Sequence, residues 1–322
     1  MKKLGYFLLV GVMGAMTLVG CSSKGNDVET TKDVETTTVV EEGFAEVVVE
    51  HLYGTTVVDK EVEKAVVFDF GALDTIDTLG IEVELAVVQA SLPEYLSQYA
   101  DTTVNAGSLK EPDLEAIFTF APDVIIISGR QATYYEQLTE IAPTIYIELN
   151  ADTYMEDFTK NTNMIASLFQ VENKVQEELA AIEAQVEEVK TIAANLEDKA
   201  LILLTNDGSV SVYGKGSRFG IIHDVLGVKT ADENIESSTH GQEANYEYIS
   251  QMNPDIIFVV DRTLVVGGTN EANTTLDNEL VNSTNAAINN KIISLNPDYW
   301  YLSAGGIKSV SEMILNIKTA IQ

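Results

Sequence analysis

Residues 113–130 (DLEAIFTFAPDVIIISGR) have the same pattern as residues 245–262 (NYEYISQMNPDIIFVVDR), and the two segments align without a gap. Each segment predicts a helix, a Pro-Asp turn and a buried apolar strand, and each ends on an arginine. Ligands of open α/β sheets bind at the carboxyl ends of strands, so Arg130 and Arg262 are expected at equivalent places in two similar units. The repeat therefore predicts two lobes that present guanidinium groups to one anionic ligand.

A third arginine, Arg218, lies in the glycine-rich segment 214–220 (GKGSRFG), which is predicted to open a helix. Such a loop is a natural place for an anion contact. The chain has three arginines and 16 lysines among its 19 basic residues, and arginine is the better residue where planar, bidentate recognition matters. The alternative is that each arginine forms an ordinary salt bridge with one of the 50 acidic residues. One shared ligand site is the preferred interpretation.

Composition limits the classes of protein that this chain can belong to. Its length of 322 residues suggests about two domains, and a hydrophobic content of 45% is enough for a core in each. The formal net charge is -31. Nucleic acid is excluded as a partner because phosphate binding needs a basic face.

The N-terminus has the features of an export signal over residues 1–20. Two lysines precede an apolar run at 4–19, and this run is shorter than the roughly 20 residues that a membrane-spanning helix needs. The run ends in LVGC, which matches the lipobox of bacterial lipoproteins, where the cysteine is lipidated and becomes the first mature residue. That residue is Cys21, the only cysteine, so a disulfide within the chain is impossible. Residues 21–43 are polar and without periodicity, and they predict a flexible tether.

Two α/β lobes, with mostly parallel sheets, are predicted at 44–160 and 199–322, joined by one long rigid helix at 161–198. Residues 151–207 contain neither glycine nor proline, and apolar residues recur there at helical spacing. A helix of a coiled coil is the alternative, although the apolar pattern is short for one. A ligand cleft is expected between the lobes.

Motifs for catalysis are absent from the sequence: it has no GxSxG, no GxGxxG after a strand, no paired cysteines and no HExxH. Of the three histidines, His51 and His223 fall in a predicted strand and a predicted helix and are interpreted as structural. His240 lies in the polar loop 237–242 (SSTHGQ), where most histidines are surface residues. Three aromatic residues follow a strand in segment 296–306 (NPDYWYLSAGG) and either cap the core or form a wall of the ligand cleft.

These segments together resemble a known family. The motifs GSRFGIIHDVLGV (216–228), STHG (238–241), NPDIIFVVDR (253–262) and NPDYWYLSAGG (296–306), with the lipobox, are similar to those of siderophore-binding lipoproteins of iron ABC importers. The branch concerned binds ferric catecholates such as petrobactin and linear bis-catecholates. The resemblance implies a class III periplasmic-binding-protein-like fold and a monomeric, extracytoplasmic receptor without enzymatic activity or intrinsic cofactor. It also implies a lipid anchor on Cys21.

The resemblance further implies roles for five residues. Arg130, Arg218 and Arg262 would hold the anionic catecholate oxygens, while His240 and Tyr301 would complete the coordination of the ferric ion. A tetradentate bis-catecholate fills four of six positions, which leaves two for a phenolate and an imidazole. A ligand with three catechol arms would need neither donor.

The family also delivers its ligand to a membrane permease through an acidic residue on each lobe. Glu115 and Glu247 occupy equivalent positions in the repeat and are the candidates. Only modest closure of the lobes is expected, because a rigid helix joins them. The alternatives are a cobalamin or haem receptor of an ABC importer and an extracytoplasmic siderophore-processing hydrolase or reductase, whose nucleophile or redox centre the sequence does not supply.

Overall fold

The structure is a computed structural model that describes residues 45–322, so the predicted export signal, the tether and Cys21 lie outside the described residues. The described part begins with an antiparallel hairpin of β1 (Val47–His51) and β2 (Gly54–Val58). His51 lies in β1, and its Nε2 is 2.9 Å from Oγ1 of Thr56. No helix between residues 45 and 322 combines the length and the apolar character needed to cross a bilayer.

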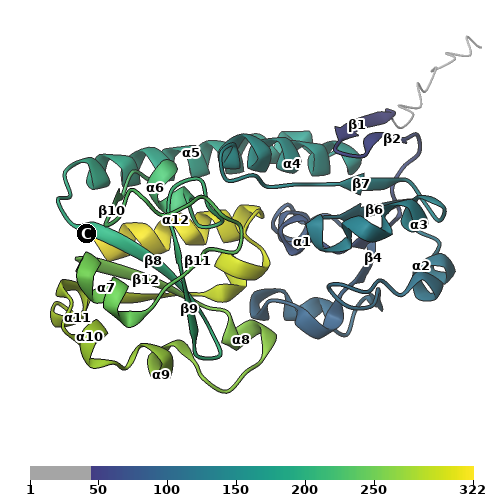
Figure 1. Ribbon diagram of the computed structural model, residues 1–322. Helices are drawn as coiled ribbons and strands as arrows, with labels where there is room; N and C mark the ends of the chain where they lie inside the picture. The colour runs from purple at the N-terminus through teal and green to yellow at the C-terminus, as the bar shows by residue number, and fades with distance from the viewer. Residues whose placement is uncertain (1–44) are drawn as a thin grey trace, which may run out of the picture. The chain divides into compact units, whose positions relative to one another are not determined.

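The N-terminal lobe is built on a parallel five-stranded sheet in the order β5-β4-β3-β6-β7 (Figure 1). All four residues of β6 are buried, as expected of a central strand in a parallel sheet. The strands are β3 (Lys64–Val67), β4 (Glu84–Val87), β5 (Val104–Asn105), β6 (Val124–Ile127) and β7 (Thr144–Tyr146). The helices are α1 (Phe70–Thr78), α2 (Leu114–Phe120) and α3 (Tyr135–Thr139), with short 3₁₀ turns at Gln89–Ser91, Glu94–Tyr99 and Gly129–Tyr134.

The C-terminal lobe has a mixed sheet in the order β11-β9-β8-β12-β13, with β10 paired to the start of β8. Its centre, β8-β12-β13, is parallel, whereas β9 and β11 are antiparallel additions at one edge. The strands are β8 (Lys199–Asn206), β9 (Ser209–Tyr213), β10 (Lys229–Thr230), β11 (Gln242–Glu243), β12 (Ile256–Asp261) and β13 (Ile292–Leu295). The helices are α6 (Ile221–Asp224), α7 (Tyr246–Met252), α8 (Thr263–Val266), α9 (Ala272–Leu276), α10 (Glu279–Asn282), α11 (Asn285–Ile288) and α12 (Ile307–Ile321).

The segment between the lobes forms two helices, α4 (Tyr154–Leu168) and α5 (Glu172–Ala194), where one was predicted. The break falls at Gln170, which has a left-handed φ of 55°. Because neither glycine nor proline stands at this break, the helical spacing of the apolar residues predicted one uninterrupted helix. In Figure 1, α4 lies along the N-terminal lobe and α5 along the C-terminal lobe, where α5 packs against α12.

The two copies of the repeat form matching units, α2-β6 and α7-β12. Asp113 caps α2 by accepting a hydrogen bond from the amide of Ala116 at 3.0 Å, and Asn245 caps α7 through the amide of Tyr248 at 2.8 Å. Both helices end on a left-handed residue just before the Pro-Asp turn. The repeat therefore sets two strand ends in equivalent surroundings, one in each lobe.

Candidate functional site

The three arginines follow regular elements of both lobes. Arg130 lies in the 3₁₀ turn after β6, and Arg262 comes directly after β12. The sequence predicted each as the last residue of its strand, but β6 ends at Ile127 and β12 at Asp261. The hydrogen bonding of each sheet stops before the arginine, so the side chains extend from the following turns. Arg218 precedes α6, in the loop where it was predicted.

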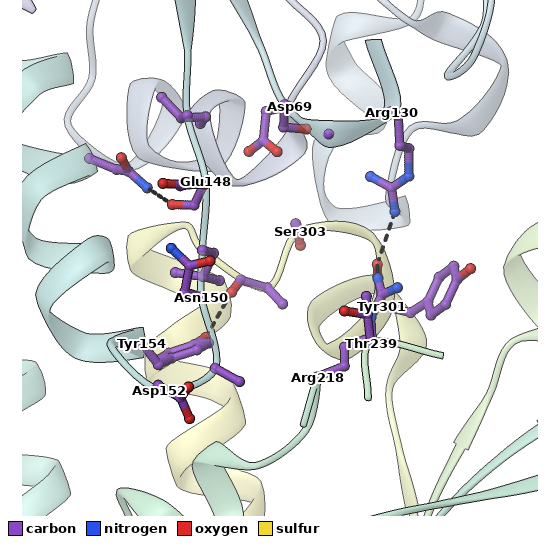
Figure 2. A pocket seen from close by; sticks show the side chains of 18 of the residues that line it. Asp69, Arg130, Glu148, Asn150, Asp152, Tyr154, Arg218, Thr239, Tyr301 and Ser303 are labelled. Carbon is purple, nitrogen blue, oxygen red and sulfur yellow. Dashed lines mark hydrogen bonds between the residues drawn. The ribbon is translucent and has the colours of Figure 1, made fainter. Parts of the chain in front are cut away.

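Tyr301 is the point at which the three guanidinium groups meet. Its carbonyl oxygen accepts a hydrogen bond from Nη2 of Arg218 at 2.7 Å and from Nη2 of Arg130 at 3.4 Å (Figure 2). Its hydroxyl accepts one from Nε of Arg262 at 2.6 Å. The guanidinium carbon of Arg218 also lies 4.1 Å from the centroid of the Tyr301 ring. Three arginines that are far apart in the sequence thus surround one tyrosine.

Every acceptor that residues 45–322 offer to these arginines is electrically neutral. Besides the carbonyl and hydroxyl of Tyr301, the amide oxygen of Asn206 accepts from Nη1 of Arg262 at 2.6 Å. All ion pairs found among residues 45–322 use lysine, and none involves Arg130, Arg218 or Arg262. The alternative of three ordinary salt bridges is therefore wrong, and the positive charge remains available to a ligand.

Burial and mutual repulsion oppose this concentration of charge. Burial lowers the pKa of Arg218 from its usual value; the neighbouring Tyr301 partly offsets this, and Arg130 and Arg262 lower the pKa further. Arginine nevertheless stays protonated in proteins. An anion at this position would relieve the repulsion among the three cations, which is the electrostatic basis for a binding site.

A cavity of about 620 Å³ opens beside this cluster. Arg130, Arg218 and Tyr301 line it, and residues of the 147–152 segment and of both lobes complete its walls. A volume of this size is in the usual range of small-molecule sites. Asp69, Glu148 and Asp152 also line the cavity (Figure 2), so its positive charge is confined to the part around Tyr301.

His240 is not part of this cluster. It is exposed, its backbone amide donates to Oγ of Ser238 at 3.1 Å, and its neighbour Thr239 lines the cavity instead. The loop packs closely against the buried ring of Tyr213 because Gly241 has no side chain. A Cβ at this position would lie only 2.6 Å from carbons of the ring. The structure thus brings Arg130, Arg218, Arg262 and Tyr301 together and leaves His240 on the adjacent loop. Its role as an iron ligand stays a prediction.

Two of the three aromatics in segment 296–306, Trp300 and Tyr301, have different roles. Trp300 is fully buried in the core, with Nε1 donating to Oδ1 of Asn316 at 3.4 Å, whereas Tyr301 lines the cavity.

Glu115 and Glu247 are exposed in the first turns of α2 and α7, and nothing in the structure tests their contact with a permease.

Asn206 is a residue of the site that sequence reasoning missed. It is the last residue of β8, which pairs in parallel with β12, so it emerges at the same sheet edge as Arg262. The sequence offered one signal for Asn206: it is a polar residue at the carboxyl end of β8, and β8 is the neighbour of β12, the strand that precedes Arg262. Polar residues at strand ends are common, and this signal alone does not single it out.

Comparison with known proteins decides the family. Residues 66–299 match the model of the periplasmic binding protein family. The chain belongs to this family. Within this family it is 40% identical, over 331 aligned positions that cover all of both chains, to the petrobactin-binding protein YclQ of Bacillus subtilis.

Solved structures of periplasmic binding proteins agree with this assignment. The crystal structure of YclQ from Bacillus subtilis matches with a TM-score of 0.84 and 42% identity, covering 86% of this chain and 99% of that one. The periplasmic catecholate-siderophore binding protein VctP of Vibrio cholerae matches with a TM-score of 0.79 and 32% identity, covering 85% and 100%. The predicted fold class and family resemblance are confirmed.

Proposed function

We propose that this protein is the substrate-binding protein of an iron ABC importer and that it captures a ferric catecholate siderophore in the cavity beside Tyr301. The observation that carries this proposal is the convergence of three arginines, none paired with a carboxylate of residues 45–322, in a chain of net charge -31. Catecholate oxygens bound to iron keep negative charge and accept charge-assisted hydrogen bonds. The likeness to a petrobactin-binding and a catecholate-siderophore binding protein supports the same ligand class.

In this proposal the protein binds its ligand and transforms nothing. Arg130, Arg218 and Arg262 hold the catecholate oxygens. Tyr301, with His240 from the neighbouring loop, supplies the two donors that a tetradentate chelate leaves open on the ferric ion. The ferric ion belongs to the cargo, and the protein needs no cofactor of its own.

The proposal also places the receptor at the outer face of the cell membrane. Lipidation of Cys21 in the lipobox would anchor it as a monomer, and residues 21–43 would give it reach. Glu115 and Glu247 would contact the permease, one from each lobe. Release of the protein from membranes by Cys21→Ala would support the anchor.

The test of the proposed ligand uses Trp300, which is the only tryptophan and adjoins Tyr301 in the sequence. A ferric catecholate absorbs in the near ultraviolet, where tryptophan emits, as well as in the visible, so energy transfer to a ferric bis-catecholate bound beside Tyr301 is expected to quench most of the tryptophan emission at micromolar concentration. The gallium complex of the same chelator is the matched control, because it should compete for the site while quenching less. Unchanged emission with the ferric complex, together with saturable binding of cobalamin or haem, would favour the alternative receptor.

A second prediction separates the metal donors from the arginines. Tyr301→Phe and His240→Ala are each expected to weaken a tetradentate ferric bis-catecholate about tenfold, because one coordination position is lost to water. A hexadentate tris-catecholate should change little. Affinities are measured by fluorescence titration, with Tyr248→Phe as the control that removes a phenol hydroxyl bonded to Asp232 in the C-terminal lobe. Equal losses for both ligand classes would remove Tyr301 and His240 from the coordination sphere.

A further inference from the structure

Tyr301 lies in a short π-helical turn, Asp298–Leu302, between β13 and α12. Such turns are rare in proteins, and those that occur are frequently found at functional sites. Although the turn follows the last strand of the C-terminal lobe, Leu302 is buried in the hydrophobic core of the N-terminal lobe. The residue proposed as a metal donor is therefore located at the junction of the two lobes, and contacts from both lobes can fix its position.

Asp74, on α1 of the N-terminal lobe, is a fully buried carboxylate with four hydrogen-bond donors around it. Two are the backbone amides of Lys308 and Ser309, at 2.9 and 2.8 Å, in the first turn of α12. The others are the hydroxyls of Tyr95 at 2.8 Å and Thr78 at 3.1 Å. Asp74 thus caps the N-terminus of a helix that belongs to the other lobe, where a carboxylate is favoured.

The same network reaches the turn that carries Tyr301. The hydroxyl of Tyr95 also lies 2.7 Å from Oγ of Ser303, so its single proton is shared between Asp74 and Ser303. Oγ of Ser303 in turn donates to the carbonyl of Asp298 at 2.7 Å. From α12, Oγ of Ser309 donates to the carbonyl of Ser303 at 2.5 Å. Both ends of the turn, on either side of Tyr301, are therefore connected to the N-terminal lobe.

Two glycines allow the close packing on which this network depends. A Cβ on Gly71 of α1 would lie 2.9 Å from the carbonyl carbon of Gly305, and a Cβ on Gly306 would overlap the carboxyl group of Asp74. Helix α1 and the start of α12 consequently meet backbone to backbone. A buried carboxylate is costly unless it is hydrogen-bonded, and a fully bonded network of this kind is rigid.

We infer that Asp74 and Tyr95 are positioning residues for Tyr301, an inference that rests on the metal-donor role proposed above. They hold the turn so that the Tyr301 phenol stays beside the arginines at the place where a tetradentate chelate leaves iron positions open. Neither residue lines the cavity, and both act through the turn.

The test compares Tyr95→Phe, Tyr301→Phe and the double variant with a ferric tetradentate bis-catecholate and a hexadentate tris-catecholate. Tyr95→Phe removes only the hydroxyl, and it is expected to weaken the tetradentate complex about three- to tenfold, the usual range for one hydrogen bond. The hexadentate complex should be affected much less. In the Tyr301→Phe background, Tyr95→Phe should cause no further loss for the tetradentate ligand.

Tyr99→Phe is the matched control, because it removes a phenol that donates to Asp77 on the same helix α1 at 2.9 Å without contacting the turn. Asp74→Asn, which sets an amide against the amides of α12, is expected to give a larger loss with the same ligand preference. Equal losses for both ligands, or fully additive losses in the double variant, would overturn the positioning role while leaving that of Tyr301 intact. If Tyr301→Phe alone leaves tetradentate binding unchanged, the donor role itself has failed, and the positioning role with it.

Discussion

Replacing Arg218 by glutamine is expected to lower the affinity for a ferric bis-catecholate about 100-fold, corresponding to about 2.7 kcal/mol. A hydrogen bond to a charged group contributes about 1.5–3 kcal/mol when its partner is otherwise left unpaired. Arg218 should have the largest effect of the three arginines, because it is the one held closely over both the ring and the carbonyl of Tyr301. Arg130 reaches the same carbonyl only at 3.4 Å.

Glutamine is the suitable replacement because its amide can still donate to the Tyr301 carbonyl and so preserve the turn. The control is Lys215→Gln, three residues away, which removes the same charge from an exposed side chain paired with Glu233 at 2.8 Å. Titration at fixed ionic strength measures both variants, since long-range charge effects depend on salt. Similar small losses for the two variants would mean that net charge alone, and not the cluster at Tyr301, governs binding.

The sequence was sufficient to predict that the arginines meet, because two of them end copies of one helix-turn-strand unit. The carboxyl ends of parallel strands gather at one edge of a sheet, and the rule holds although the strands stop just before Arg130 and Arg262. Tyr301 came from its resemblance to the family motif. Among three adjacent aromatics, only the structure distinguishes the buried Trp300 from the tyrosine in the cavity.

Other features had no usable signal in the sequence. The break between α4 and α5 depends on one left-handed glutamine, Gln170, where neither glycine nor proline stands. Asp74 is one of 50 acidic residues, and its burial follows from the close approach of α1 to α12, which tertiary packing decides. The neutral partners of the arginines could not be predicted either, because the sequence does not show whether an asparagine at a strand end accepts a hydrogen bond from a guanidinium group.

Asn206→Asp is the change expected to be most informative about those neutral partners. Asn206 accepts from Nη1 of Arg262 at 2.6 Å, while the hydroxyl of Tyr301 accepts from Nε. Aspartate has nearly the same shape, so the geometry should persist, but the new carboxylate would pair with the guanidinium. The affinity for the anionic ferric chelate is expected to fall at least about tenfold, as Coulomb energies of a few kcal/mol at about 4 Å allow.

The stability of Asn206→Asp and the affinities of two control variants make this prediction specific. Because the new ion pair stabilises the folded protein, the free energy of unfolding in urea should stay equal or rise while ligand affinity falls, the opposite of what a damaged site would give. Asn289→Asp makes the same amide-to-carboxylate change at an exposed position after α11, before the start of β13 and away from the strand ends that carry Asn206 and Arg262, and it should change affinity little. Asn206→Ala removes the orienting contact without adding charge and should fall between the two. Affinity retained in Asn206→Asp would show that Arg262 does not act through its free charge, because a neutralised guanidinium would then serve as well as a cationic one.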